Sequence, residues 1–133
     1  MDEMWSYIGN KKNQYWLWWA IDHKTGNVLG YSFGTREHKS LNNLLDILKP
    51  IDISKVHTDG NFAYKKYIKN AQVIIGKKDT QKIERKHLSL RTWCSRLVRK
   101  GIRFSKSYLL HRIVIGLIIN FKFFHRPLPF HLL

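Results

Sequence analysis

Three strand-like segments near the start of the chain, joined by tight turns, limit the fold more than any other feature. Residues 14–22 (QYWLWWAID) are aromatic and nearly continuous in apolar content, a pattern typical of a buried strand. Residues 2–9 show the two-residue alternation of a strand, and residues 28–33 form a third strand pattern. Polar turns at 10–13 and 23–27 separate the three segments. They predict an antiparallel meander.

The remainder of the chain alternates helical and extended patterns. Leucines at helical spacing follow Ser40, and Pro50 ends that pattern. We expect, in chain order, a helix over 41–48 capped by Ser40, a strand over 53–58, a helix over 62–68, a strand over 73–75, a helix over 80–100 stopped by Gly101, and a helix over 108–124 capped by Ser105 or Ser107. Three antiparallel strands followed by alternating elements predict an α/β fold with one mixed sheet flanked by helices.

The length and composition indicate one folded domain. A chain of 133 residues with 44% hydrophobic content can bury one core, and we place the domain at 1–124 and a tail at 125–133. Cys94 is the single cysteine, so no disulfide forms within the chain, and a reducing, cytoplasmic location is expected. The most apolar run, 113–119, is too short to span a bilayer, which argues against a membrane partner.

Positive charge is concentrated in the second half of the chain. The formal net charge is +15, and residues 71–133 hold 14 Lys or Arg against two acids. Such an imbalance favours nucleic acid as the partner. The side chains that we predict to contact DNA phosphates are Lys77, Lys78, Arg85, Arg91, Arg96, Arg99, Lys100, Arg103 and Lys106. The alternative is a solvated charged face without a ligand.

Three acids stand out by their positions. Asp2 lies on the first strand, Asp59 ends the fourth strand, and Glu84 lies on the basic helix. If the fourth strand lies beside the first, these carboxylates converge and need cations to offset their repulsion. Two Mg²⁺ ions bridged by carboxylates form the usual phosphodiester-cleaving site. Each acid also has a simpler interpretation: a turn before Gly60, an ion pair between Glu84 and a neighbour, and a solvated Asp2.

The histidines predict no metal site. His57 lies two residues before Asp59 and is interpreted as a packed strand histidine, with a supporting role beside the acids as the alternative. The other histidines show no spacing typical of metal ligands.

Taken together, these motifs resemble the DDE transposases, most closely the insertion-sequence-1 family. The resemblance rests on residues 1–9 (MDEMWSYIG), 58–60 (TDG), 80–85 (TQKIER), 88–91 (LSLR) and 104–107 (FSKS). It implies that residues 1–124 form a ribonuclease H-like catalytic domain.

The resemblance also implies roles for single residues. Asp2, Asp59 and Glu84 match the family's metal-binding acids, and 24 residues separate the last two, as in the family. They would hold two Mg²⁺ ions, with Mn²⁺ as a substitute. Arg91 fills the place of a basic residue seven positions after the glutamate. Glu3 is ranked below Asp2 because adjacent strand residues point to opposite faces.

The function that follows from the resemblance is metal-dependent cleavage and transfer of DNA strands during transposition of an insertion sequence. It implies element ends and target DNA as partners, a multimer on DNA, and a DNA-binding region encoded in an upstream frame. The alternatives are a nuclease that cuts without joining, a non-enzymatic basic nucleic-acid-binding protein, and an inactive transposase remnant.

Overall fold

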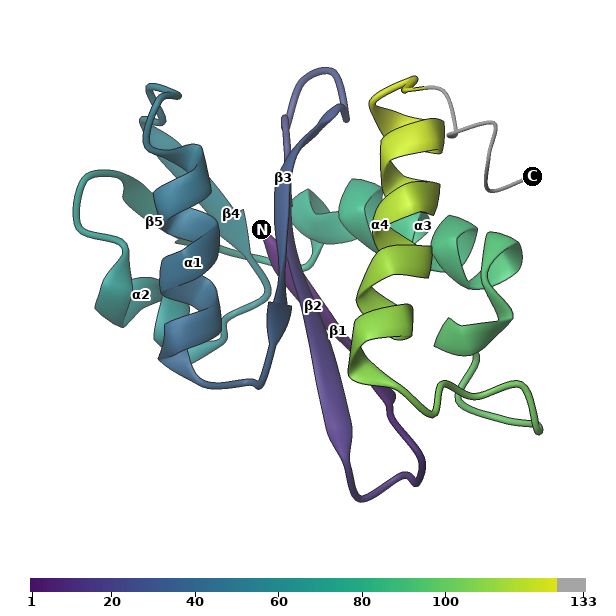
Figure 1. Ribbon diagram of the computed structural model, residues 1–133. Coiled ribbons are helices and arrows are strands. Elements are labelled where there is room, and N and C mark those ends of the chain that lie inside the picture. Colours follow the sequence, from purple (N-terminus) through teal and green to yellow (C-terminus); the bar gives the residue numbers. More distant parts are fainter. Residues whose placement is uncertain (127–133) are drawn as a thin grey trace.

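A three-stranded antiparallel sheet forms the middle layer of the structure, a computed structural model that describes residues 1–126 (Figure 1). Its strands lie in the order β1-β2-β3, with bounds Asp2–Tyr7 for β1, Gln14–Ile21 for β2 and Val28–Gly34 for β3. The predicted meander is therefore confirmed, with the aromatic strand β2 in the middle.

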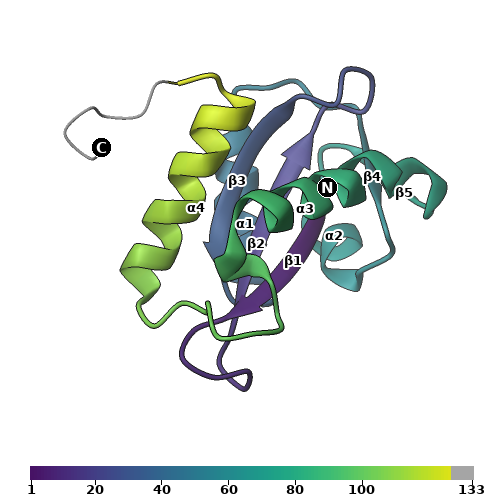
Figure 2. The ribbon, with the colours of Figure 1, turned by 90° about the vertical axis from the view of Figure 1, so that its right-hand side faces the viewer.

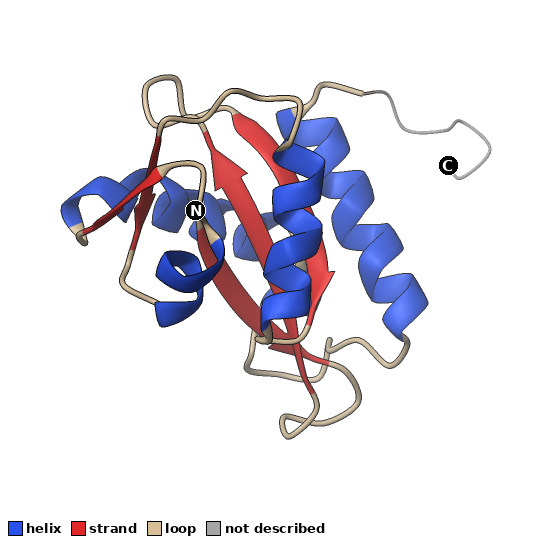
Figure 3. Ribbon diagram, turned by 90° about the vertical axis from the view of Figure 1, so that its left-hand side faces the viewer, coloured by secondary structure: helices blue, strands red, loops and turns tan. Residues whose placement is uncertain are grey.

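Helices cover both faces of this sheet. Two helices pack on the face shown in Figure 2, α3 (Gln81–Trp93) and α4 (Tyr108–Phe123). The opposite side, shown in Figure 3, carries α1 (His38–Leu48), α2 (Phe62–Tyr67), β4 (Lys55–Thr58) and β5 (Gln72–Ile75). The mixed α/β class predicted from the sequence is confirmed.

Burial on both faces explains the continuous apolar run of β2. Leu17 and Trp19 point toward α3 and α4, where they join Ile83 and Leu90 in one buried cluster. Trp18 and its neighbours on the other face join a second buried cluster with the leucines of α1. Successive side chains of a strand alternate between faces, so a strand covered on both sides needs apolar residues at nearly every position.

The predicted single mixed sheet is wrong in one respect. β4 pairs in parallel with β5 in a separate two-stranded sheet. The backbone nitrogen of Met1 donates a hydrogen bond to the carbonyl oxygen of His57 at 2.8 Å, which joins the start of β1 to β4. A ladder needs several residues in register, and a single hydrogen bond of this kind does not make one.

The basic helix ends earlier than predicted. α3 stops at Trp93, Cys94 is extended, and Ser95–Leu97 forms a short 3-10 turn, η2, instead of helix up to residue 100. The turn places Leu97, which is 1% exposed, beside β1 in the same core as Cys94. A straight helix would carry Leu97 past the sheet, so burial of this side chain explains the early end.

The helix caps differ from the prediction at one of two sites. α1 begins at His38, so Ser40 lies inside the helix, where its carbonyl accepts a hydrogen bond from the Ser32 hydroxyl. Gly34 leaves space for the Ser40 side chain, because a Cβ at position 34 would overlap the Ser40 hydroxyl. At α4 the Ser107 hydroxyl accepts from the backbone of Leu110, so the prediction of Ser107 as a cap is confirmed.

The end of the chain was predicted as a tail over 125–133, and residues 127–133 lie outside the described residues. Within residues 1–126, no helix combines the length and the apolar character needed to cross a membrane.

His111 links α4 to the sheet through two buried hydroxyls. Its ring nitrogens lie 3.0 Å from the Ser6 hydroxyl and 2.6 Å from the Ser105 hydroxyl. Burial, with a smaller contribution from Arg96, lowers the pKa of His111 to about 4. The native imidazole is therefore neutral at pH values where the unfolded one takes up a proton, so folding stability falls as the pH drops from 6.5 toward 4.

We predict that this histidine alone costs the folded state about 2 kcal/mol between pH 7 and pH 5. His111→Gln should remove that part of the pH dependence, even if the variant is less stable at both pH values. Urea unfolding of both proteins at the two pH values measures the difference. His38→Gln, an exposed position on α1, is the control and should keep the wild-type slope. An equal slope for wild type and His111→Gln would contradict the prediction.

Candidate metal centre

The start of β1 and the end of β4 bring two of the predicted acids together. Carboxylate oxygens of Asp2, Glu3 and Asp59 all lie within 4.8 Å of one another. The hydrogen bond from Met1 to His57 explains this, because Asp2 and Asp59 follow its two partners by one and two residues. Asp2 is 7% exposed, whereas Asp59 is open to solvent. Of these two predicted acids, Asp2 is therefore buried and Asp59 is accessible.

A tight turn sets the position of Asp59. Gly60 has φ of +105°, a value that residues with a Cβ rarely adopt. The turn lets an Asp59 carboxylate oxygen accept a hydrogen bond from the backbone of Asn61 at 3.3 Å, and the Asn61 side chain then caps α2. The predicted turn at Asp59 and Gly60 is therefore present. It uses one Asp59 carboxylate oxygen and leaves the other free to bind a ligand.

Asp2 is the most perturbed acid of the group. Burial, with smaller contributions from the charges of Asp59 and Glu3, raises the pKa of Asp2 to about 7. Within residues 1–126 neither Asp2 nor Asp59 forms an ion pair with a Lys or Arg. Arg36 lies 3.5 Å from a Glu3 oxygen, so within the described chain a basic side chain pairs with Glu3 and the two aspartates are left without such a partner.

His87 on α3 faces Asp2 as a neutral ring. Its Nδ1 lies 3.8 Å from an Asp2 oxygen, and burial, followed by the charge of Arg91, lowers the pKa of His87 to about 3. The Trp19 indole donates to the other ring nitrogen at 2.7 Å, so the proton of the neutral ring sits on Nδ1 and points toward Asp2. At 3.8 Å this is a packing contact, longer than a hydrogen bond, and it adds no positive charge beside Asp2.

Glu3 has a structural role that the sequence did not indicate. It points to the α2 side, as the strand alternation predicted, yet its carboxylate lies close to the two aspartates. Its side chain is 3% exposed and accepts hydrogen bonds from the Tyr64 hydroxyl at 2.7 Å and the Asn61 amide at 2.6 Å. Because both oxygens have partners, Glu3 ties β1 to α2 and supports the turn that carries Asp59.

Glu84 does not belong to the cluster of three carboxylates. It is exposed in the first turn of α3, three residues before His87, and residues at that spacing share one side of a helix. This spacing places Glu84 one turn before His87, whose ring lies 3.8 Å from an Asp2 oxygen. Within the described residues its carboxylate makes no hydrogen bond or ion pair, so the predicted alternative of a local ion pair is not seen. Its role as a ligand stays a prediction.

The predicted DNA-contacting side chains divide into two groups, and none of the nine pairs with an acid within residues 1–126. Arg91, Arg96 and Arg99 are half-buried; the Arg99 guanidinium lies 4.7 Å from the Trp5 ring centre, and the Arg91 Nε is buried without a hydrogen-bond partner. The exposed group comprises Lys77, Lys78, Arg85, Lys100, Arg103 and Lys106.

One cluster was missed from the sequence. His23, His57 and Asp79 lie together, although we predicted no metal site from the histidines. They come from three separate segments, so no fixed spacing could have revealed them. His57 is half-buried on β4, as predicted, but it is not simply packed.

Comparison with known proteins places the chain in a family. The sequence pattern of the IS1 transposases matches residues 1–125. The chain is 42% identical over 125 residues to the insertion element iso-IS1n protein InsB of Shigella dysenteriae, covering 94% of this chain and 95% of that protein. It is 42% identical over 122 residues to the IS1 protein InsB of Shigella sonnei, covering 92% and 93%. No solved structure matches.

The chain belongs to the IS1 transposase family. The resemblance inferred from its motifs is therefore confirmed, and the protein is a transposase of an insertion element.

We predict that a divalent cation stabilises the fold through Asp2. Ionising this buried carboxyl group destabilises the folded state as the pH rises from about 4 to 7, because its folded pKa is raised. In EDTA at pH 8, Asp2→Asn should therefore be more stable than wild type by about 1–2 kcal/mol. Added Mn²⁺ should raise the melting temperature of wild type and leave Asp2→Asn unchanged.

Thermal unfolding with and without Mn²⁺ measures both effects. The control is Asp46→Asn, an exposed acid on α1 that pairs with Lys49, and it should respond to Mn²⁺ like wild type. Equal stabilisation of Asp2→Asn and wild type by Mn²⁺ would show that the cation binds elsewhere.

Proposed function

We propose that this chain carries out the chemical steps of transposition, the metal-dependent cleavage and joining of DNA strands. The observation that carries the proposal is the meeting of Asp2 and Asp59, without a basic partner, beside the helix that presents Glu84. Membership of the IS1 transposase family supports the same activity.

The residues present fit a pair of Mg²⁺ ions, with Mn²⁺ as a substitute. All candidate ligands are carboxylate oxygens, which Mg²⁺ prefers. Burial, followed by the charges of Asp59 and Glu3, raises the pKa of Asp2, and a bound cation would stabilise its ionised form. A pair of metal ions held by these residues would supply activation of a water or 3′-hydroxyl nucleophile and stabilisation of the leaving oxygen.

The protein groups have separable tasks in this scheme. Asp2 and Asp59 would hold the metals, and Glu84 would complete the ligand set from α3. His87 packs beside the Asp2 carboxyl group as a neutral ring, with its Nδ1 at 3.8 Å. Arg91, one turn beyond His87, is half-buried and brings a positive charge to α3 that a DNA phosphate would offset.

The remaining basic side chains are proposed to position the DNA strand. They form no ion pairs with acids in the described chain. They lie just before α3, on α3 itself and in the segment after it. We propose element ends and target DNA as substrates, a multimer on DNA, and cooperation with a DNA-binding region encoded upstream. A cytoplasmic location fits this role.

The fold proposed for this activity is ribonuclease H-like, with the catalytic domain over 1–124. In its support, three antiparallel strands come first in the chain, and β4 then returns so that its end meets the start of β1. The separate pairing of β4 with β5 leaves this meeting point in place.

We predict that Glu84→Gln and Asp59→Asn each lower metal-dependent strand cleavage and joining by at least about 100-fold, because each removes charge that holds the metals. The assay uses labelled DNA ends of the encoding insertion element with Mg²⁺, and scores both the nicked and the joined product. Glu37→Gln, an exposed acid beside α1, should keep wild-type activity.

DNA binding separates this proposal from a purely binding role. Both active-site variants should bind the same DNA as tightly as wild type or more tightly, since they remove negative charge. Wild-type strand cleavage by Glu84→Gln would exclude Glu84 as a ligand. Binding without any metal-dependent cleavage by wild type would favour the non-enzymatic role, and cleavage without joining would favour a nuclease.

A further inference from the structure

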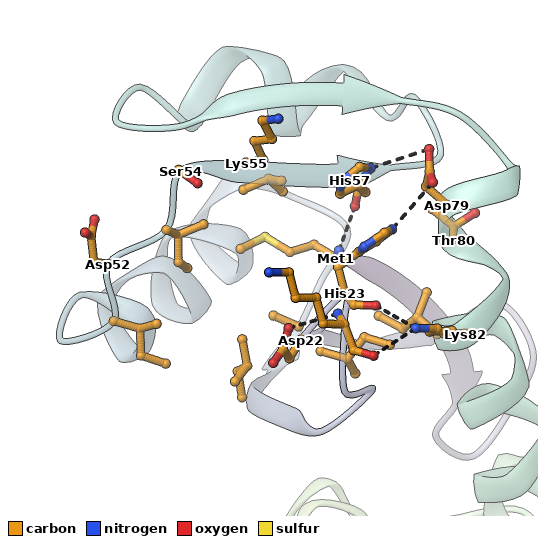
Figure 4. A pocket seen from close by; sticks show the side chains of 18 residues that line it. Met1, Asp22, His23, Asp52, Ser54, Lys55, His57, Asp79, Thr80 and Lys82 are labelled. Atoms are coloured by element: carbon orange, nitrogen blue, oxygen red, sulfur yellow. Dashed lines mark hydrogen bonds and ion pairs between the residues drawn. The ribbon is translucent and has the colours of Figure 1, made fainter.

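A second group of metal-binding side chains lies outside the carboxylate cluster, at the mouth of a pocket (Figure 4). His23 comes from the turn after β2, His57 from β4, and Asp79 from η1 (Lys78–Thr80) before α3. One ligand atom from each lies within 4.8 Å of those of the other two. Three elements far apart in the sequence therefore present two imidazoles and a carboxylate to one point.

The distances fit metal ligands better than hydrogen bonds. His23 Nε2 lies 3.5 Å from one Asp79 oxygen, Oδ1, and His57 Nδ1 lies 3.5 Å from the other, Oδ2. Good hydrogen bonds between nitrogen and oxygen span about 2.7–3.2 Å. Two neighbouring ligands on a tetrahedral zinc ion, each about 2.0–2.1 Å from the metal, lie about 3.3–3.4 Å apart. The observed spacing is close to that value.

His57 supplies an independent sign of a missing partner. Its Nδ1 is buried and has no hydrogen-bond partner. Buried polar atoms without a partner are rare in folded proteins, and they usually mark a bound water, ion or functional contact. The His57 ring stacks on His23 with ring centres 4.2 Å apart and 18° between the ring planes, so one ring rotates out of this stack when both bind the same ion.

The surroundings hold these groups in place. The Lys82 ammonium donates to the backbone carbonyls of His23 and Lys24 at 2.7 and 3.1 Å, and this anchors the turn that carries His23. The adjoining cavity has a volume of about 510 Å³, and its lining includes Lys24, Lys55 and Lys82 as well as Asp22 and Asp52. It leaves room for a further ligand such as a water molecule.

We propose that His23, His57 and Asp79 form a binding site for a transition metal of the zinc class, with a coordination position open to the cavity. Imidazole nitrogens select zinc-like ions, whereas the all-oxygen cluster of Asp2 and Asp59 suits Mg²⁺ or Mn²⁺. The two sites therefore differ in their metals.

A metal at this site would connect the segments that carry Asp59 and Glu84. His57 lies two residues before Asp59, and Asp79 lies five residues before Glu84. A metal shared by them fixes the start of α3 against β4 and the turn after β2. Binding at this site is independent of the proposed DNA cleavage and can be measured without it.

Cobalt titration of the full chain tests the proposal. After treatment with EDTA, wild type should bind one equivalent of Co²⁺ with the visible absorption of a tetrahedral nitrogen–oxygen site, and Zn²⁺ should displace it. His23→Ala and Asp79→Ala should lose this absorption. His23 is 51% exposed, so its replacement leaves the core intact, and circular dichroism checks the fold of both variants.

Two control variants separate the sites. Asp59→Asn should keep the cobalt absorption, which shows that the signal does not come from the carboxylate cluster. His38→Ala, at an exposed histidine on α1, should keep it as well. Absence of saturable Co²⁺ binding by wild type, or an unchanged signal in His23→Ala and Asp79→Ala, would overturn the proposal.

Discussion

The contact between the start of β1 and the end of β4 is the interaction on which the candidate centre depends. A single backbone hydrogen bond from Met1 to His57 joins the two sheets there and sets Asp2 beside Asp59. The cost of this arrangement is visible in Asp2, whose pKa is raised to about 7 mainly by burial. A fold that keeps such carboxylates together without a basic partner is suited to a bound cation.

Packing of the hydrophobic core sets the position of α3 relative to the aspartates. β2 is buried on both faces, and its Leu17 and Trp19 receive Ile83 and Leu90 of α3. This packing turns His87 toward Asp2 and leaves Glu84 exposed, one turn earlier on the same side. The geometry of the proposed chemistry thus follows from apolar packing, and the polar groups occupy positions that the core determines.

Much of this arrangement was predictable from local patterns. The aromatic run of β2 required burial on two faces, and Asp59 followed by Gly60 indicated the turn that presents a carboxylate. The end of α3 at Trp93 was not predictable, because it depends on burial of Leu97 beside β1. The proximity of Glu3, and the grouping of His23 with Asp79, also depend on tertiary contacts between distant segments, which no spacing in the sequence encodes.

We propose that Asp2, Asp59 and Glu84 together hold the metal ions of this transposase. Anomalous diffraction from crystals soaked in Mn²⁺ tests it most directly, because the manganese signal locates the ion without reference to activity. We expect a peak in contact with carboxylate oxygens of Asp2 and Asp59, at about 2.1–2.2 Å, with the Glu84 side chain turned toward it. Manganese bound away from these aspartates, or a Glu84 carboxylate directed away from the bound ion, would contradict the account.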